Sequence, residues 1–164
     1  RFDVVKMLCN TGHIHGWVIG KIANTAYDKE NWDLLDILWR LTRQCDKYEI
    51  MSKAVRSGNY EVVKRFIYSI DDHIYMIMPV AIECKQYNII KLLIPICKYN
   101  EIYFIKAIKN NQYEVVKVFI PHVQSYLDYG GTIAARCGHT EIKDLITSWS
   151  TGYAIVDSVI SSFL

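Results

Sequence analysis

One segment recurs along the chain: Tyr60-Glu61-Val62-Val63-Lys64-Arg65-Phe66-Ile67 returns as Tyr113-Glu114-Val115-Val116-Lys117-Val118-Phe119-Ile120. A third copy lies between them, as Tyr87-Asn88-Ile89-Ile90-Lys91-Leu92-Leu93-Ile94. In each copy the apolar residues fall in two pairs separated by four positions. This spacing is typical of a helix with one buried side and does not fit the alternation of a strand. The recurring segment is therefore predicted to be an amphipathic helix.

Weaker copies extend the series at both ends. The copies start at residues 2, 32, 60, 87, 113 and 140, so the period is 26–30 residues. A fixed period of this size predicts an array of repeats in which each unit buries its apolar side against its neighbours. Because the copy at Phe2 already reads as the middle of a unit, we expect further residues upstream of Arg1.

A second signal precedes five of the copies by six residues. It is a small residue, which we call the anchor alanine: Ala26, Ala54, Ala81, Ala107 and Ala134. A short polar or glycine-containing turn follows it, such as Ser57-Gly58-Asn59. Each unit is therefore predicted to be a first helix, a tight turn and an antiparallel second helix. Pro95 and Pro121 stand where a second helix should end.

The repeat resembles the ankyrin repeat, most clearly in Ala134-Ala135-Arg136-Cys137-Gly138-His139-Thr140-Glu141-Ile142. The resemblance covers residues 2–147 and implies an all-α solenoid of helix-turn-helix repeats. The family's period is about 33 residues, against about 34 for tetratricopeptide and 40–47 for HEAT or armadillo repeats. The shorter units here imply shortened or missing β-hairpin fingers. This divergent array, which is rich in Ile, Tyr and Asn, also resembles the ankyrin arrays of large DNA viruses.

The last segment departs from the repeat. We expect residues 1–149 to form the array and residues 150–164 a C-terminal capping helix. Val156, Val159, Ile160 and Phe163 make an amphipathic stripe in it. A terminal repeat has no neighbour on one side, so an atypical unit has to cover its apolar face. A dimerisation helix is the alternative.

Composition limits the classes of partner. The 19 basic and 17 acidic residues give a net charge of +2, which does not favour nucleic acid or an anionic membrane as the partner. No apolar run approaches the roughly 18–20 residues of a membrane span. The five cysteines are odd in number and include no C-x-x-C pair. This pattern favours reduced thiols and an intracellular location, in host cytoplasm or a virion if the protein is viral.

No group of residues predicts catalysis or a cofactor. Cys9, His13 and His15 have metal-ligand character, but no second ligand pair is near in sequence. Cys137 and His139 fall in a repeat turn, and Asp71-Asp72-His73 falls in an inter-repeat loop. Gly130-Gly131 lacks the lysine of a phosphate-binding loop. We therefore expect no enzyme, no metal and no cofactor.

The surface of the first helices carries the candidate binding residues. If the first helices line the concave side, as the ankyrin resemblance implies, that side presents Lys53, Arg56, Glu83, Lys106, Lys109 and Arg136. The expected function is a protein-interaction scaffold that engages a host or viral protein. The alternative is a structural component of a larger assembly or virion, which would associate with itself through repeat edges and the terminal helix. The aromatic residues that open the second helices are expected to be packed and not to stack on nucleic acid.

Overall fold

The computed structural model describes residue 7, residues 15–70 and residues 74–161, with side chains up to residue 152. Every regular element in these residues is a helix, and none of them lies in a β-strand. The predicted all-α class is confirmed. The chain divides into two compact units, Arg1–His73 (unit 1) and Ile74–Leu164 (unit 2), which are described in turn.

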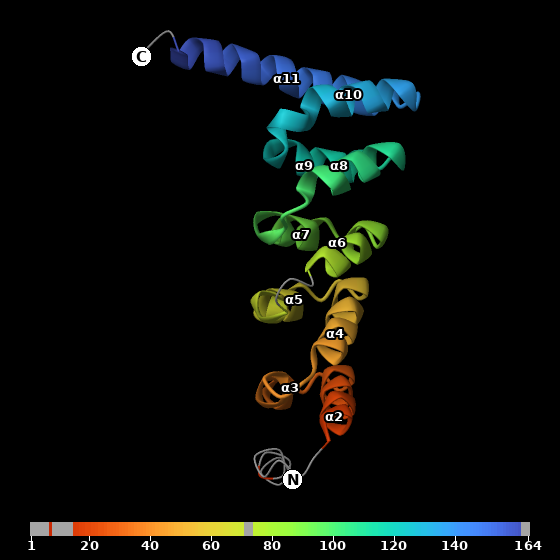
Figure 1. Cartoon of the computed structure of the whole chain (residues 1–164), viewed down its shortest axis with the longest axis vertical. Helices are drawn as coiled ribbons and strands as arrows, with labels where there is room; N and C mark the ends of the chain where they lie inside the picture. Colours follow the sequence, from red (N-terminus) through yellow and green to blue (C-terminus); the bar gives the residue numbers. More distant parts are fainter. Residues whose placement is uncertain (1–6, 8–14, 71–73, 162–164) are drawn as a thin grey trace. The chain divides into compact units, whose positions relative to one another are not determined.

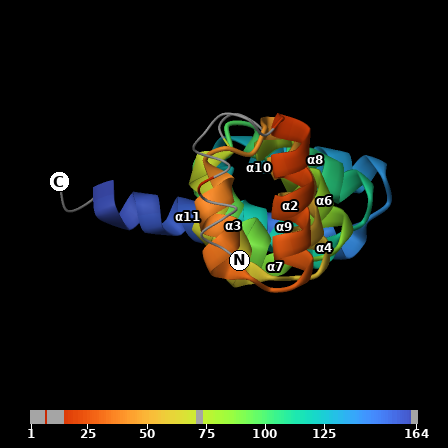
Figure 2. The ribbon, with the colours of Figure 1, turned by 90° about the horizontal axis from the view of Figure 1, so that it is seen from below.

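Unit 1 contains two antiparallel helix pairs. Its elements are α2 (Gly16–Asp28), α3 (Trp32–Trp39), α4 (Gln44–Arg56), α5 (Tyr60–Phe66) and the 3₁₀ turn η1 (Ile67–Ser69). The first helix of each pair contacts the second, and α2 also packs against α4. Figures 1 and 2 show α2 and α4 on one side of unit 1 and α3 on the other.

Unit 2 repeats this arrangement. Its elements are α6 (Ile74–Glu83), α7 (Tyr87–Leu93), η3 (Ile94–Ile96), α8 (Asn100–Lys109), α9 (Tyr113–Phe119), η4 (Ile120–His122), η5 (Gln124–Tyr126), α10 (Leu127–Arg136) and α11 (Thr140–Ser161). The first helix α8 packs against α10, while the second helices α7, α9 and α11 pack in sequence. Successive pairs within the unit are therefore stacked (Figure 1).

The second helices begin at the repeat positions, which are Trp32, Tyr60, Tyr87, Tyr113 and Thr140. The copy at residue 2 lies outside the described residues. All five anchor alanines are buried, with at most 2% of their surface exposed. Small residues also set how closely first helices approach, since a Cβ on Gly130 of α10 would lie 2.6 Å from Phe104 Cε1 of α8. Helix pairing thus depends on small side chains at fixed positions.

The turn inside each pair has one recurring geometry. In the five turns that the structure describes, one residue is left-handed: Glu30, Gly58, Lys85, Asn111 and Gly138. The amide of the next residue donates to the carbonyl of the anchor alanine over 2.8–2.9 Å. This is the Schellman arrangement, which satisfies carbonyls at the end of a helix. The anchor alanine is therefore both the buried contact and the acceptor that closes the turn.

A 3₁₀ turn follows each of the second helices α5, α7 and α9, at η1, η3 and η4. α7 and α9 end at Leu93 and Phe119, and Pro95 and Pro121 lie in the 3₁₀ turns that follow, η3 and η4. A proline at this place cannot donate the next helical hydrogen bond. The predicted end of these second helices is confirmed.

Pro79 is a proline inside a helix, since α6 runs past it. It has no amide hydrogen to donate to the carbonyl of Tyr75 four residues earlier. The hydroxyl of Tyr103, on α8, donates to that carbonyl over 2.8 Å. The neighbouring pair thus supplies a hydrogen bond that α6 cannot make for itself.

The C-terminal segment differs from the prediction. A separate capping helix was expected from residue 150, but α11 continues without interruption from Thr140 to Ser161. Ser and Thr do not break it because their hydroxyls bond to carbonyls of the preceding turn, as Thr147 does to Lys143 and Thr151 does to Thr147. The side chains of Val156, Val159, Ile160 and Phe163 lie outside the described residues, as does the end of the chain.

Replacing a buried anchor alanine should destabilise unit 2. We expect Ala107→Leu to lower the free energy of unfolding by about 1–3 kcal/mol, because the site has no room for a larger side chain. Ala135→Leu is the matched control, since Ala135 is exposed on α10 and should change stability by less than about 0.5 kcal/mol. Denaturant titration followed by circular dichroism measures both. Equal effects of the two substitutions would contradict the repeat register.

The turn geometry predicts a substitution that should raise the free energy of unfolding. Lys85 holds a left-handed backbone, with φ of 55°, which costs a residue with a Cβ roughly 1 kcal/mol. Lys85→Gly should therefore raise the free energy of unfolding by about 0.5–1 kcal/mol. Gly138→Ala should lower it by a similar amount, although a Cβ there meets nothing within 4 Å. Thermal unfolding of both variants checks the pair, and a destabilising Lys85→Gly would rule the strain argument out.

Candidate interaction surface

One series of positions recurs along the first helices. These positions are spaced i, i+3, i+7 and i+10, so they lie on one side of the helix, and the last falls two residues after the anchor alanine. We call them the first-helix stripe. Its members on α4 are Asp46, Glu49, Lys53 and Arg56, and on α2 they are Val18, Lys21, Thr25 and Asp28. The first residue of the series immediately precedes α8 and α10, where the members are Tyr99, Ile102, Lys106 and Lys109, and Tyr126, Tyr129, Ile133 and Arg136.

In unit 1 the stripe cation Lys53 is paired with stripe carboxylates. The Lys53 ammonium donates to Asn24 Oδ1 over 2.9 Å and lies 3.5 Å from Asp28 and 3.7 Å from Glu49. Of the two predicted binding residues in unit 1, Lys53 is thus engaged between α2 and α4, whereas Arg56 is exposed. Asp46 is held at 2.8 Å by Arg43, and this hydrogen bond raises the pKa of the Arg43 guanidinium.

In unit 2 the predicted binding residues are all exposed. Glu83 ends α6, Lys106 and Lys109 end α8, and Arg136 ends α10. Among the described residues, no carboxylate lies within 4 Å of Lys106, Lys109 or Arg136. The structure therefore places three cations and one carboxylate at the ends of three first helices of one unit, without internal ion pairs for the cations.

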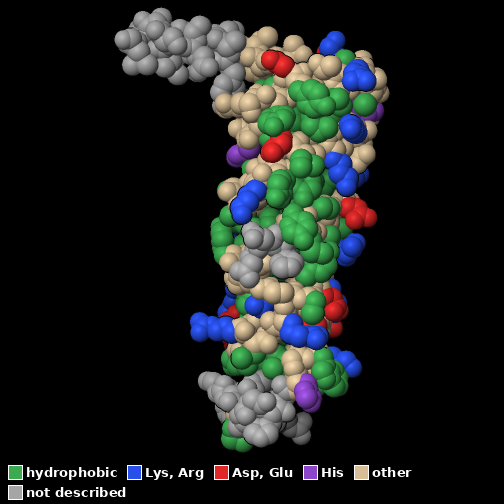
Figure 3. All heavy atoms as spheres, in the orientation of Figure 1, with side chains coloured by type: hydrophobic (Ala, Val, Ile, Leu, Met, Phe, Trp, Pro, Cys, Tyr) green, Lys and Arg blue, Asp and Glu red, His purple; other side chains and the backbone are tan. Residues whose placement is uncertain are grey.

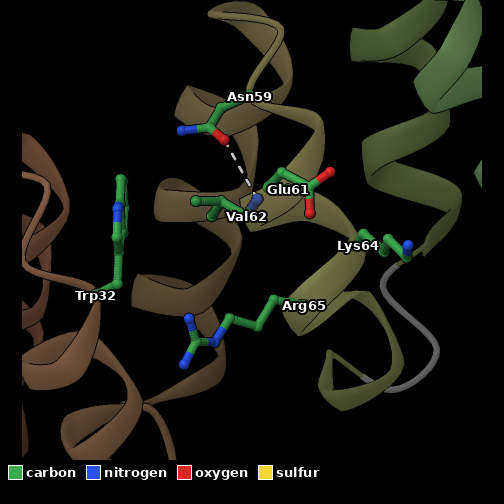
Figure 4. A pocket seen from close by; sticks show the side chains of 6 residues that line it. All are labelled: Trp32, Asn59, Glu61, Val62, Lys64 and Arg65. Atoms are coloured by element: carbon green, nitrogen blue, oxygen red, sulfur yellow. Dashed lines mark hydrogen bonds between the residues drawn. The ribbon is translucent and has the colours of Figure 1, made fainter.

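A hollow of about 410 Å³ lies on the second-helix side of unit 1, lined by residues of α3 and α5 (Figure 4). Asn59 accepts a hydrogen bond there from the Val62 amide, and so caps α5. Arg65 forms an ion pair with Asp36. In Figure 4 the Glu61 and Lys64 side chains point away from Trp32, so the charged groups do not converge on one point. The hollow has no arrangement of acid, base and nucleophile around a common centre.

A second hollow, of about 430 Å³, lies between α10 and α11 in unit 2. Leu127, Gly131 and Ile146 are among its lining residues, and hydroxyls of Thr132, Thr147 and Thr151 line it as well. These hydroxyls donate to carbonyls of their own helices. The hollow therefore follows the line where the two helices meet. Its threonine hydroxyls already donate their hydrogen bonds to backbone carbonyls.

Of the Cys, His and Asp residues considered for other chemistry, the structure describes His15, Cys137 and His139. Cys9, His13 and Asp71-Asp72-His73 lie outside the described residues, and His15 is exposed before α2. The ring of His139 lies 3.4 Å from the Lys109 carbonyl. In the described ranges no three His, Cys, Asp or Glu residues are placed to hold a metal ion. No helix in these ranges is long and apolar enough to cross a bilayer.

The aromatic residues that open the second helices are half-buried: Trp32, Tyr60, Tyr87 and Tyr113. Trp32 packs edge-on against Tyr27 of the preceding first helix, with ring centroids 5.9 Å apart. The expectation that they are packed side chains agrees with this environment.

The exposed aromatic members of the stripe did not enter the sequence prediction. Tyr99 and Tyr126 are 27 residues apart, and so are Ile102 and Tyr129. This spacing matches the repeat and could have marked them as equivalent surface positions.

The thiols should differ in reactivity in the folded chain. Cys45 and Cys137 are free and exposed, whereas Cys97 is half-buried and its burial raises the pKa of the thiol. The thiolate is the reactive form. We therefore expect iodoacetamide at pH 8 to modify Cys45 and Cys137 before Cys97, with the Cys97 rate still rising at higher pH. Mass spectrometry over time measures this. All five cysteines should react in denaturant without reductant, and a thiol that stays blocked would reveal a disulfide.

The chain matches no protein-family model, no curated protein and no solved structure. The resemblance to ankyrin repeats therefore rests on the repeated residues of the sequence.

Proposed function

We propose that the chain is a non-catalytic protein-interaction scaffold, built as an ankyrin-like solenoid that binds a partner protein through the side formed by its first helices. If the protein is viral, the partner is a host or viral protein in an intracellular setting. The proposal includes no cofactor, metal, membrane or nucleic acid.

The observation that carries this proposal is the separation of core and surface within each helix pair. Buried side chains from one side of each first helix, such as Met51 and Phe104, fill the core together with those of the second helices. The first-helix stripe occupies the same positions on α2, α4, α8 and α10, but its side chains differ. They include carboxylates on α4, lysines on α8 and tyrosines at α10. A constant backbone that presents variable side chains along stacked repeats suits recognition of an extended protein surface.

A structural role in a larger assembly is the second candidate. It is favoured by α11, which has 22 residues, against seven or eight in α3, α5, α7 and α9. A helix of this length offers a surface for a second copy of the chain. In this reading the partner is the protein itself.

One experiment separates the two candidates. The whole 164-residue chain is cross-linked in cell lysate and also measured alone by light scattering at increasing concentration. As a scaffold it should stay monomeric and capture a partner in stoichiometric amount. Lys106→Glu/Lys109→Glu/Arg136→Glu should weaken that capture at least tenfold.

The matched control reverses the charge of three exposed lysines on the second helices of unit 2, Lys91→Glu/Lys117→Glu/Lys143→Glu. It changes the net charge equally and should leave capture unchanged. Concentration-dependent self-association without a captured partner would favour the structural role. Equal losses in both variants would remove the first-helix side from the proposal.

A further inference from the structure

Four large apolar side chains stand exposed on the first-helix stripe of unit 2. Tyr99 is 48% exposed, Ile102 58%, Tyr126 40% and Tyr129 56%. They occupy the same two stripe positions on α8 and α10, which pack against each other. The four side chains therefore form one patch across two neighbouring helices, which we call the apolar patch.

A basic row continues the stripe toward the ends of the same helices. Lys106 and Lys109 follow the apolar patch on α8, and Arg136 follows it on α10. As shown above, these cations have no carboxylate partner among the described residues. Figure 3 shows hydrophobic side chains gathered over the first helices of unit 2, with Lys and Arg side chains along one edge. The surface thus has an apolar half and a positively charged half.

Unit 1 shows that the fold does not require this composition. At the positions equivalent to Tyr99 and Ile102, α4 carries Asp46 and Glu49. Its stripe cation Lys53 is neutralised by Glu49 and Asp28. The same helix pair is therefore built with carboxylates where unit 2 has exposed apolar groups. The apolar patch is dispensable for packing, so its presence needs another cause.

We propose that the stripe of α8 and α10 is a docking site for an acidic peptide segment of the partner protein. Apolar side chains of the segment cover the apolar patch, and its Asp or Glu side chains pair with Lys106, Lys109 and Arg136. The inference rests on the proposed scaffold function and names the chemistry of its partner. Covering exposed Tyr and Ile side chains supplies the binding energy, and the basic row fixes the orientation of the segment.

The side chains fit a peptide better than a single-stranded nucleic acid. Bases would need successive aromatic rings along a basic groove that follows the phosphates. Here Ile102 cannot stack on a base, and the tyrosines of α8 and α10 sit on helices whose axes pack roughly 8–10 Å apart.

The test is a selection from a library of random 12-residue peptides displayed on phage, with the whole chain as bait. We expect the enriched peptides to combine apolar residues with two or more Asp or Glu. One enriched peptide is then labelled and its dissociation constant measured by fluorescence polarisation. Ile102→Ser/Tyr129→Ser and Lys106→Glu/Lys109→Glu/Arg136→Glu should each weaken binding at least tenfold, and rising salt should weaken binding to the parent.

Two controls keep the result specific. Lys91→Glu/Lys117→Glu/Lys143→Glu should bind like the parent, and Ile102→Val should also retain binding because it keeps an apolar side chain. Circular dichroism verifies that every variant is folded, which the exposure of the substituted side chains favours.

The experiment distinguishes failure of the proposed docking site from failure of the proposed scaffold function. Enriched peptides that bind equally well to Ile102→Ser/Tyr129→Ser would overturn this site and leave the scaffold function standing. Preference for an oligothymidylate probe over every peptide, or light scattering showing that the patch joins two copies of the chain, would overturn the acidic segment as occupant. No enrichment at all, together with no capture from lysate, would overturn both proposals.

Discussion

The hydrogen bond to the carbonyl of the anchor alanine is the constraint on which each helix pair depends. It closes the turn only if the preceding residue is left-handed, and it places the second helix against a side chain small enough to be buried completely. The anchor alanine meets both requirements, since its carbonyl accepts the hydrogen bond and its small side chain is buried. The helices can therefore be short, seven or eight residues in α3, α5, α7 and α9, and still be fixed in direction. Tertiary packing, rather than helix propensity, stabilises helices of this length.

The positions of the helices could be predicted because their signals are local and repeated. The start of α5 at Tyr60 and of α9 at Tyr113 follows from the apolar spacing, and the end of α9 follows from Pro121. The left-handed turns were visible only where glycine marks them, at Gly58 and Gly138. At Glu30 and Lys85 tertiary closure imposes the same backbone on residues that do not favour it.

The surface could be predicted only in part. The exposed positions of Arg56, Lys109 and Arg136 follow from the repeat register, but the partners of Lys53 do not, because they depend on how α2 lies against α4. The prediction placed residues 150–164 in a helix of their own, whereas residues 150–161 continue α11, and Ser and Thr hydroxyls there bond to carbonyls of the same helix. Register thus determines which residues face outward, whereas pairing between side chains requires the three-dimensional arrangement.

The contact between Tyr103 and the carbonyl of Tyr75 has a consequence for how such a chain can change in length. Pro79 makes α6 dependent on a hydroxyl from the next pair. The pair α6–α7 therefore shares a hydrogen bond with the next pair: deleting α8, or inserting a repeat whose first helix lacks a tyrosine at that position, removes this donor. Repeat arrays grow and shrink by duplication and loss of whole units, and at this junction the loss of one unit also removes a hydrogen bond from its neighbour.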